Sequence, residues 1–234
     1  MSQPLPDNRC VACHAICSFF GSRDGFDYFR CSRCHTLQLS PFPTPERLRE
    51  LYARDYASAG HYSADPEESF AANEPFYYAV RKIIQSASHP SGKVLDVGCG
   101  WGGFGEALKG ENYIGIDYST EAVRFCQSRG LDVRQGGLES LEAESFAYVV
   151  CLSVFEHIVE YDRFLEDIRR VLRSGGTLVI LIPTAAFAYR AGRIYQMVTG
   201  AKTLPELHQT FCPPWHPVLF SVAGAREILE RNDF

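Results

Sequence analysis

The sequence predicts an α/β fold built on a doubly wound parallel sheet, with a small cysteine-rich unit in front of it. Strand and helix signals alternate from residue 91 to residue 182. The unbroken apolar run from Phe146 to Leu152 suits a central strand, because a parallel sheet is covered on both faces. A glycine-rich stretch after the first strand marks a tight turn into a helix. This alternation predicts right-handed β-α-β crossovers.

Each element of the alternating region has its own signal. Short apolar runs predict strands, and apolar residues at every third or fourth position predict helices. The SGG stretch at 174–176 interrupts one such helical pattern before the last apolar run. Strands are expected at 93–98, 112–117, 131–135, 146–154 and 177–182, and helices at 103–109, 119–130 and about 164–172.

Three regions are expected along the chain. Residues 1–40 form the cysteine-rich unit, and residues 41–90 a helical linker that covers the ligand site of the core. In this linker Thr44 precedes Pro45 as a helix start, and 74–88 has helical spacing. Residues 91–234 form the core, in which the proline-rich stretch 183–220 suits a lid and 222–231 a last helix.

Composition excludes several classes of protein. The chain has 234 residues, of which 46% are hydrophobic and 22% charged, as in a soluble globular protein. Its net charge of −5 gives no general attraction for nucleic acid. The N-terminus lacks the apolar core of a signal peptide, and no run is long enough to span a membrane. We therefore expect a cytoplasmic protein.

Four of the nine cysteines form two CxxC pairs, Cys10 with Cys13 and Cys31 with Cys34, separated by seventeen residues. This spacing is typical of a structural zinc site, in which two knuckles complete a tetrahedral shell of four thiolates. Gly21, Asp24 and Gly25 suit a hairpin between the knuckles. Nearby His14, Cys17 and His35 are unnecessary as ligands once the four thiolates are present. Residues 1–40 are thus predicted to be a zinc ribbon.

The glycine-rich stretch after the first core strand carries the ligand-binding signal. It contains Asp96, Gly98, Cys99 and Gly100, and it also satisfies the GxGxxG pattern of dinucleotide sites. The carboxylate of Asp96 would attract the ammonium group of S-adenosylmethionine (SAM) and repel a pyrophosphate. Asp117, which ends the next strand, can accept hydrogen bonds from the ribose hydroxyls of either SAM or NAD. Asp96 therefore favours SAM over NAD.

The four successive segments 94–109, 113–123, 146–158 and 171–184 resemble motifs of the class I SAM-dependent methyltransferases, which have a Rossmann-like fold. Residues 10–52, with the ribbon and RCSRCHTLQLSPFPTPERLRELY, are similar to a zinc-ribbon-bearing branch of bacterial methyltransferases. That branch includes ubiquinone-biosynthesis-like O-methyltransferases and deoxysugar C-methyltransferases.

The resemblance implies roles for single residues. Asp96, Gly98 and Gly100 would line the methionine side of SAM, with Ser153 near the methionine end. Those expected to hold ribose and adenine are Asp117, Tyr118, Gly137 and Leu138.

Three departures from the family pattern accompany the resemblance. Many relatives carry an acidic residue where Gly137 stands, and an aspartate where Ala147 stands. The family fold also usually continues after a phrase such as LERNDF into two further strands. We therefore expect either that the chain is truncated or that another chain completes the sheet, as in a homodimer.

Methyl transfer is an in-line displacement that depends on alignment, and an oxygen or carbon acceptor also has to lose a proton. His157 and Glu156 follow the fourth core strand, and His157 is the first candidate for the base or for a substrate contact. His216, in the lid, is the second. Each histidine also has a purely structural interpretation: His157 could support its loop through a hydrogen bond, and His216 could be a turn residue between prolines. Tyr52, Tyr56 and Tyr62 either close over SAM or pack the ribbon.

The predicted function is transfer of a methyl group from SAM to an oxygen or carbon of a small molecule, such as a sugar, a quinol or a natural product. An alternative is an RNA methyltransferase that binds nucleic acid through its ribbon, but the negative net charge of the chain argues against it. A non-catalytic SAM-binding interaction protein is another. The sequence does not reveal the acceptor.

Overall fold

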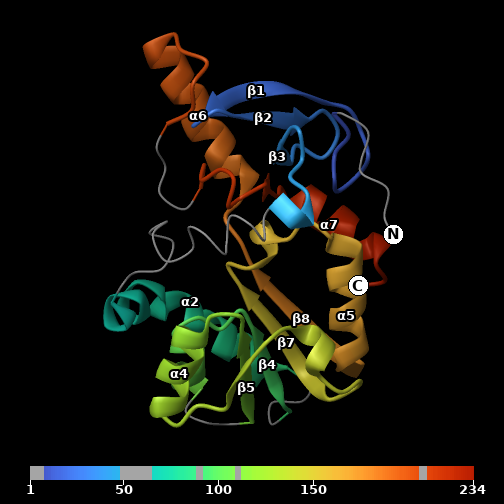
Figure 1. Ribbon diagram of the computed structural model, residues 1–234. Coiled ribbons are helices and arrows are strands. Elements are labelled where there is room, and N and C mark those ends of the chain that lie inside the picture. Colours follow the sequence, from blue (N-terminus) through green and yellow to red (C-terminus); the bar gives the residue numbers. More distant parts are fainter. Residues whose placement is uncertain (1–7, 48–64, 88–91, 109–111, 206–209) are drawn as a thin grey trace. The chain divides into compact units, whose positions relative to one another are not determined.

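The computed structural model describes residues 8–47, 65–87, 92–108, 112–205 and 210–234, and Figure 1 shows their elements. The chain divides into two compact units. One contains the described parts of 57–155 together with 163–181, and we call it the sheet unit. The other contains the described parts of 1–56 and 182–234 together with 156–162, and we call it the ribbon unit. Tyr52, Tyr56 and Tyr62 lie outside the described residues.

The sheet unit contains five parallel strands in the order β6-β5-β4-β7-β8. This order confirms the predicted doubly wound sheet. The chain runs outward from β4 to one edge and then returns to build the other half from β7. The strand order reverses between β4 and β7, and sheets of this kind usually bind ligands at the carboxyl ends of the strands beside such a switch point. The strands are β4 (Val94–Val97), β5 (Tyr113–Asp117), β6 (Val133–Gln135), β7 (Phe146–Leu152) and β8 (Leu172–Leu181).

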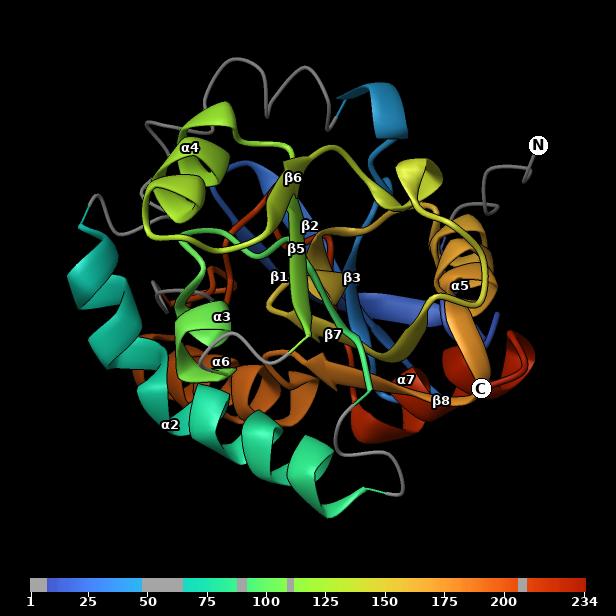
Figure 2. The same ribbon diagram turned by 90° about the horizontal axis from the view of Figure 1, so that it is seen from below.

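Helices cover both faces of this sheet. Figure 2 shows α2 (Pro66–Ser86), α3 (Gly103–Leu108) and α4 (Thr120–Ser128) on one face and α5 (Tyr161–Val171) on the other. The first three helices contribute Val80, Phe104 and Cys126, among others, to a core that also contains Val94 and Val150. The sheet unit also has two short 3-10 turns, Leu138–Ser140 and the start of Phe155–His157.

Local capping chemistry explains where helices begin. The Ser119 Oγ accepts a hydrogen bond from Ala122 N at 3.2 Å, so α4 begins where the sequence predicts. The structure corrects the expected start of α2, since the helix begins at Pro66 rather than at Glu74. Asp65 caps it by accepting from Glu67 N at 2.9 Å, and Pro75 is tolerated inside the helix.

The last core strand is also longer than predicted. Strand β8 begins at Leu172 and includes the SGG stretch, which was expected to precede the strand. Pairing with β7 shifts register between Phe146 and Tyr148, because residues 173–176 bulge out of the ladder. Gly175 has a φ of +71°, a conformation that suits glycine at such a bulge.

The ribbon unit contains a four-stranded antiparallel sheet in the order β1-β2-β3-β9. Strands β1 (Cys17–Arg23) and β2 (Phe26–Cys31) form the predicted hairpin, whose turn places Asp24 and Gly25 at positive φ. Strand β3 (Leu37–Leu39) pairs with β9 (Val218–Leu219) from the far end of the chain. The boundaries of the ribbon, the linker and the lid in the sequence stay predictions.

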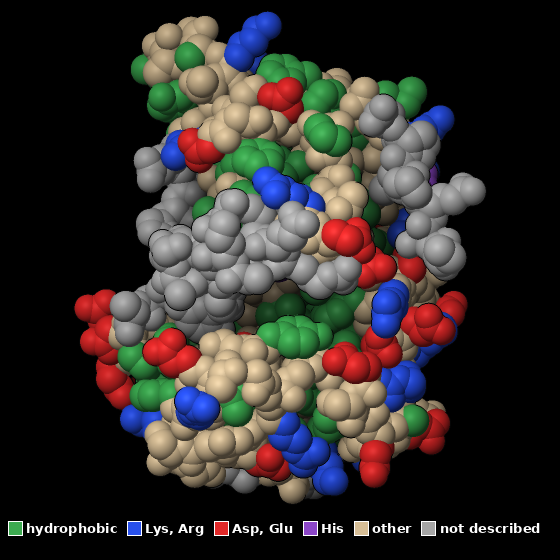
Figure 3. All heavy atoms as spheres, viewed as in Figure 1, with side chains coloured by type: hydrophobic (Ala, Val, Ile, Leu, Met, Phe, Trp, Pro, Cys, Tyr) green, Lys and Arg blue, Asp and Glu red, His purple; other side chains and the backbone are tan. Residues whose placement is uncertain are grey.

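The segment predicted as a lid contains regular structure. It forms α6 (Ala185–Thr199) and β9, and the last helix is α7 (Val222–Arg231), as expected. Tyr28 and Leu37 from the ribbon pack with Ala188 and Leu219 in one core. Helix α6 also exposes apolar side chains, including Ile194, Met197 and Val198. Figure 3 shows hydrophobic side chains at the surface around the outer end of this helix. None of the described helices has the length and apolar composition of a membrane span.

A pair of glycines tests how closely the turn after β4 is packed. Gly102 and Gly130 have similar φ values of +78° and +82°, but a Cβ at Gly102 would lie 2.7 Å from Leu131 Cδ1 whereas one at Gly130 would meet nothing within 4 Å. We expect Gly130→Ala to lower the free energy of unfolding by about 1–2 kcal/mol, from backbone strain alone. Gly102→Ala should cost about 1–3 kcal/mol more because of overpacking. Urea unfolding measures both, and equal losses would contradict this packing.

Candidate functional site

The turn after β4 is shaped by glycine. Gly98, Gly100 and Gly102 have φ values of +65°, +53° and +78°, in the left-handed region that favours glycine. A Cβ at Gly98 would lie only 2.6 Å from Val154 Cγ2 on the loop after β7. The N–H groups of Gly98, Cys99, Gly100 and Gly102 all donate hydrogen bonds within the protein, so the turn is held tightly at the carboxyl edge of the sheet, beside the switch point between β4 and β7.

Asp96 is a buried carboxylate within β4, with only 2% of its surface exposed. Tyr113 Oη donates a hydrogen bond to its Oδ2 at 3.0 Å. Burial raises the pKa of Asp96 to about 7, and this hydrogen bond opposes the rise. A group that titrates near neutral pH inside a ligand-binding edge is a candidate for recognising a cation.

Asp117 ties together the loops that follow β4 and β5. Its Oδ2 accepts a hydrogen bond from Gly100 N at 2.9 Å, and its Oδ1 accepts one from Ser119 N at 2.8 Å. A carboxylate can accept about four hydrogen bonds, so these two contacts leave it able to accept from ribose hydroxyls as well. Cys99 lies in the same turn, and the Cys126 thiol donates to Gly100 O at 3.3 Å.

Tyr118 and Gly137 meet at the ends of β5 and β6. Tyr118 is 74% exposed, and its hydroxyl occupies the space that a Cβ at Gly137 would need. Glu139 Oε2 would lie 2.5 Å from that Cβ. Both atoms are the ends of exposed side chains, so a side chain at position 137 would have to displace Tyr118 and Glu139. The carboxylate of Glu139 lies two residues from the place where many relatives carry an acid.

The structure thus brings together most of the expected SAM-binding residues. Asp96, the glycine turn and Asp117 are adjacent, and Tyr118 lies against Gly137, which leads into Leu138. Ser153 follows β7 with a φ of +55° and donates its N–H to Leu181 O at 2.9 Å. All these positions follow carboxyl ends of parallel strands, except Asp96, which lies inside β4, and Asp117, which is the last residue of β5.

Sequence reasoning missed three side chains of this site: Tyr113, Cys126 and Glu139. Tyr113 begins a buried strand, and a hydroxyl in such a place needs a partner, which was an available signal. Cys126 was interpreted as small apolar filling. Nothing in the sequence indicates that it approaches Gly100, because that contact depends on how α4 packs.

A second polar cluster lies in the ribbon unit and contains Glu156, His157 and His216. One carboxylate oxygen and one nitrogen of each imidazole all lie within 4.8 Å of one another. The imidazole centroids are 4.7 Å apart, with rings at 73°. Glu156 is 1% exposed, and burial raises its pKa to about 8. The three residues predicted as catalytic are therefore neighbours, although His216 is 59 positions beyond His157 in the sequence.

The four cysteines of the CxxC pairs also converge. Cys10 Sγ lies 3.5 Å from Cys34 Sγ, and Cys13 Sγ lies 3.4 Å from Cys31 Sγ. All four sulfur atoms lie within 4.8 Å of one another and are buried. Four thiolates about 2.3 Å from a tetrahedral zinc ion are roughly 3.8 Å apart, so the donor set and its spacing fit such an ion. None of the nine cysteines forms a disulfide.

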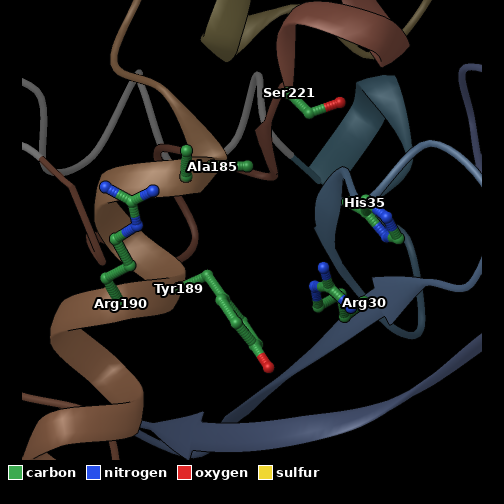
Figure 4. Close-up of a pocket in the computed structure, with 7 residues that line it drawn as sticks. Arg30, His35, Ala185, Tyr189, Arg190 and Ser221 are labelled. Atoms are coloured by element: carbon green, nitrogen blue, oxygen red, sulfur yellow. The ribbon is translucent and has the colours of Figure 1, made fainter.

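A cavity of about 340 Å³ lies in the ribbon unit, and none of the expected site residues is among the residues that line it (Figure 4). The segment predicted as a lid supplies Ala185, Tyr189 and Arg190, and the ribbon supplies Arg30 and His35. The Arg30 guanidinium lies 4.2 Å from the centre of the Tyr189 ring, a cation–π contact. The cavity thus combines an aromatic wall with positive charge.

Known proteins resemble this chain mainly in the sheet unit. Residues 95–180 match the family described as "Methyltransferase domain". Phthiotriol/phenolphthiotriol dimycocerosates methyltransferase 1 of Mycobacterium ulcerans is 34% identical over 50% of this chain and 49% of its own length. Ubiquinone biosynthesis O-methyltransferase of Hahella chejuensis is 33% identical over 41% of this chain and 45% of its own length. The chain thus spans about half the length of the curated relatives it matches.

A solved structure agrees on the fold. The SAM-dependent methyltransferase from Thermotoga maritima is 20% identical, with a TM-score of 0.51 over 79% of this chain and 78% of its own. This likeness concerns the fold alone. The match of residues 95–180 to the methyltransferase domain family confirms the resemblance that the motifs carry, to the class I SAM-dependent methyltransferases.

Proposed function

We propose that the protein transfers a methyl group from SAM to an oxygen or carbon atom of a small molecule. The observation that carries the proposal is the placement of Asp96 and Asp117 on the neighbouring strands β4 and β5, with Asp117 hydrogen-bonded to the glycine turn beside the switch point of the sheet. SAM supplies an electrophilic methyl group on a sulfonium. The chain's own task is to hold the methyl donor and the acceptor in line and to exclude water.

The residues present fit SAM. Asp96 offers a negative charge to the ammonium of the methionine moiety, beside the turn that Gly98 and Gly100 form at positive φ. Asp117 accepts from the ribose hydroxyls, and Tyr118 with Leu138 borders the adenine. Because Gly137 offers no acid, Glu139 is the carboxylate that lies nearest to that position. Cys99 and Ser153 complete the rim.

The acceptor has to lose a proton when an oxygen or carbon is methylated. Glu156, His157 and His216 are the proposed site of proton removal, with His157 first among them, since it directly follows the strand end that carries Ser153 and is only half buried. The relatives named above act on dimycocerosate lipids and in ubiquinone biosynthesis, which supports a small acceptor with a hydroxyl group. The cavity lined by Tyr189 and Arg30 is a candidate for part of its binding.

The ribbon is proposed to hold one structural zinc ion on Cys10, Cys13, Cys31 and Cys34, since four thiolates leave no open position for a reactant. The absence of disulfides among nine cysteines supports the cytoplasm as the location. A homodimer and a small-molecule acceptor, rather than nucleic acid, remain the proposed partners.

Binding of S-adenosylhomocysteine (SAH) tests the cofactor site, because SAH keeps the ammonium and the ribose of SAM. Asp96→Asn should weaken SAH binding by about 10-fold to 100-fold, which is the loss expected for a charged hydrogen bond. Titration calorimetry measures this, with the exposed acid variant Glu121→Gln as a control that binds normally. Binding of NAD instead of SAH would overturn the proposal, and unchanged SAH binding by Asp96→Asn would overturn the role of Asp96.

SAH binding should also depend on pH. Asp96 is mostly neutral below its pKa of about 7 and ionised above it, and only the ionised form attracts the ammonium. The affinity should therefore rise about 10-fold between pH 6 and pH 8, because binding is linked to loss of one proton. The same titrations at pH 6, 7 and 8 with Asp96→Asn should show a flat profile. An equally steep profile for the variant would assign the dependence to another group.

Removing one thiolate tests the ribbon. We expect Cys31→Ser to lose the thiolate-bound zinc and the protection of β1, β2 and β3 against hydrogen exchange, because metal binding and folding of such ribbons are coupled. Cys212→Ser, outside the cluster, should keep both. The zinc that a mercurial reagent releases is measured by mass spectrometry. An equally folded ribbon in a variant without thiolate-bound zinc would contradict a structural metal.

A further inference from the structure

The cluster of Glu156, His157 and His216 has the ligand types of a metal site that is separate from the cysteines. Its three donor atoms lie within 4.8 Å of one another. Three ligands about 2.1 Å from one ion are roughly 3.0–3.4 Å apart, so small side-chain rotations bring these donors to an ion. Two imidazoles and one carboxylate are a common set for first-row transition ions with open positions.

The backbone fixes both imidazoles in the state that binds metals. His157 Nδ1 lies 2.8 Å from Trp215 O, and His216 Nδ1 lies 3.2 Å from Thr210 O. A carbonyl oxygen only accepts, so Nδ1 carries the proton in both rings. In the neutral imidazoles Nε2 then holds the lone pair. Metal-bound histidines usually make this second hydrogen bond, which orients the ring.

Glu156 supplies an independent sign of a missing partner. Its Oε2 is buried and has no hydrogen-bond partner among the residues that the structure describes. Its neighbour Tyr161 is also buried, and after burial the charge of Glu156 is what raises the pKa of the Tyr161 hydroxyl. Burying a carboxylate without a partner is costly, and proteins usually pair such a group or coordinate it to a metal.

We propose that Glu156, His157 and His216 bind one divalent first-row transition-metal ion, such as zinc, and that this ion keeps open coordination positions. Magnesium fits less well, since it prefers an all-oxygen shell. The open positions distinguish this site from the ribbon, whose four thiolates saturate the ion.

The role of this ion rests on the proposed function. An acceptor hydroxyl that enters an open position would be held by the ion, which lowers the pKa of the hydroxyl and so eases removal of its proton. The ion site would thus select acceptors with a metal-binding oxygen, such as a vicinal diol or a catechol. Binding of the ion itself is tested without SAM and without any acceptor.

Zinc stoichiometry tests the proposal. The wild-type chain is saturated with zinc, desalted and analysed by mass spectrometry, before and after a mercurial reagent that releases thiolate-bound zinc. We expect two ions per chain, of which the reagent releases one. Glu156→Gln and His216→Asn should each keep only the releasable ion. His14→Gln, which changes an exposed histidine of the same unit, should keep two.

The ribbon ion serves as an internal check, because a variant that keeps it retains that fold. Should a variant fail to fold, cobalt titration of the wild type still decides. The first equivalent should add thiolate charge-transfer absorption, and the second only weak visible bands from nitrogen and oxygen ligands. One ion per wild-type chain in both measurements would overturn the proposal, as would a second ion that Glu156→Gln and His216→Asn retain. Loss of SAH binding, in contrast, would count only against the proposed function.

Discussion

The Asp117 carboxylate holds the ligand-binding edge of the sheet unit in its shape. It is the last residue of β5, and one oxygen accepts from Gly100 while the other accepts from Ser119. The first contact fixes the glycine turn after β4, and the second fixes the start of α4. Both loops leave neighbouring parallel strands, so one side chain sets the distance between them. Replacing this carboxylate would affect the geometry of the turn as well as its charge.

Asp96 and Glu156 are buried carboxylates whose surroundings differ. Asp96 has a hydrogen-bond donor in Tyr113, which partly offsets the cost of burial. Glu156 has an oxygen without a partner among the described residues, and burial raises its pKa further. Natural proteins rarely bury such groups unless function requires them. The two acids follow the same logic, since each is a negative charge that a ligand cation would stabilise.

The sequence was most informative where signals are local. The parallel strands, the hairpin turn at Asp24–Gly25 and the ends of α4 and α7 follow from apolar runs, turn residues and capping residues, and the structure agrees. The sequence was less informative for α2, because Pro75 suggested a helix start near residue 74 whereas the helix begins after Asp65, which caps it. It was also less informative for β8, because the SGG stretch forms a bulge within the strand instead of ending a helix before it. The motifs indicated the residues of the proposed SAM site, but not their neighbours Tyr113 and Cys126, whose contacts depend on packing.

Long-range pairing in the ribbon unit shows most clearly what a sequence pattern leaves out. Strand β9 adds to the ribbon sheet from residues 218–219, and Arg231 on α7 donates to Ala12 O at 2.7 Å, beside the first CxxC knuckle. Arg33, in the second knuckle, pairs with Glu227 of the same helix at 2.7 Å. The sheet that contains the ribbon hairpin therefore also includes residues from the far end of the chain.

Because residues far from the cysteines contact the two knuckles, the proposed ribbon metal would stabilise more of the ribbon unit than the knuckles alone. The buried side chain of Gln38 contacts the first knuckle: it accepts a hydrogen bond from Val11 N at 2.8 Å and donates one to Arg9 O at 2.7 Å. At the second knuckle, the Ser221 hydroxyl donates a hydrogen bond to Cys34 O. Such contacts orient the backbone that presents the thiolates, as outer-shell groups do around metal sites. Because Ser221 also caps α7, a change at the four sulfur atoms would be transmitted to the start of that helix.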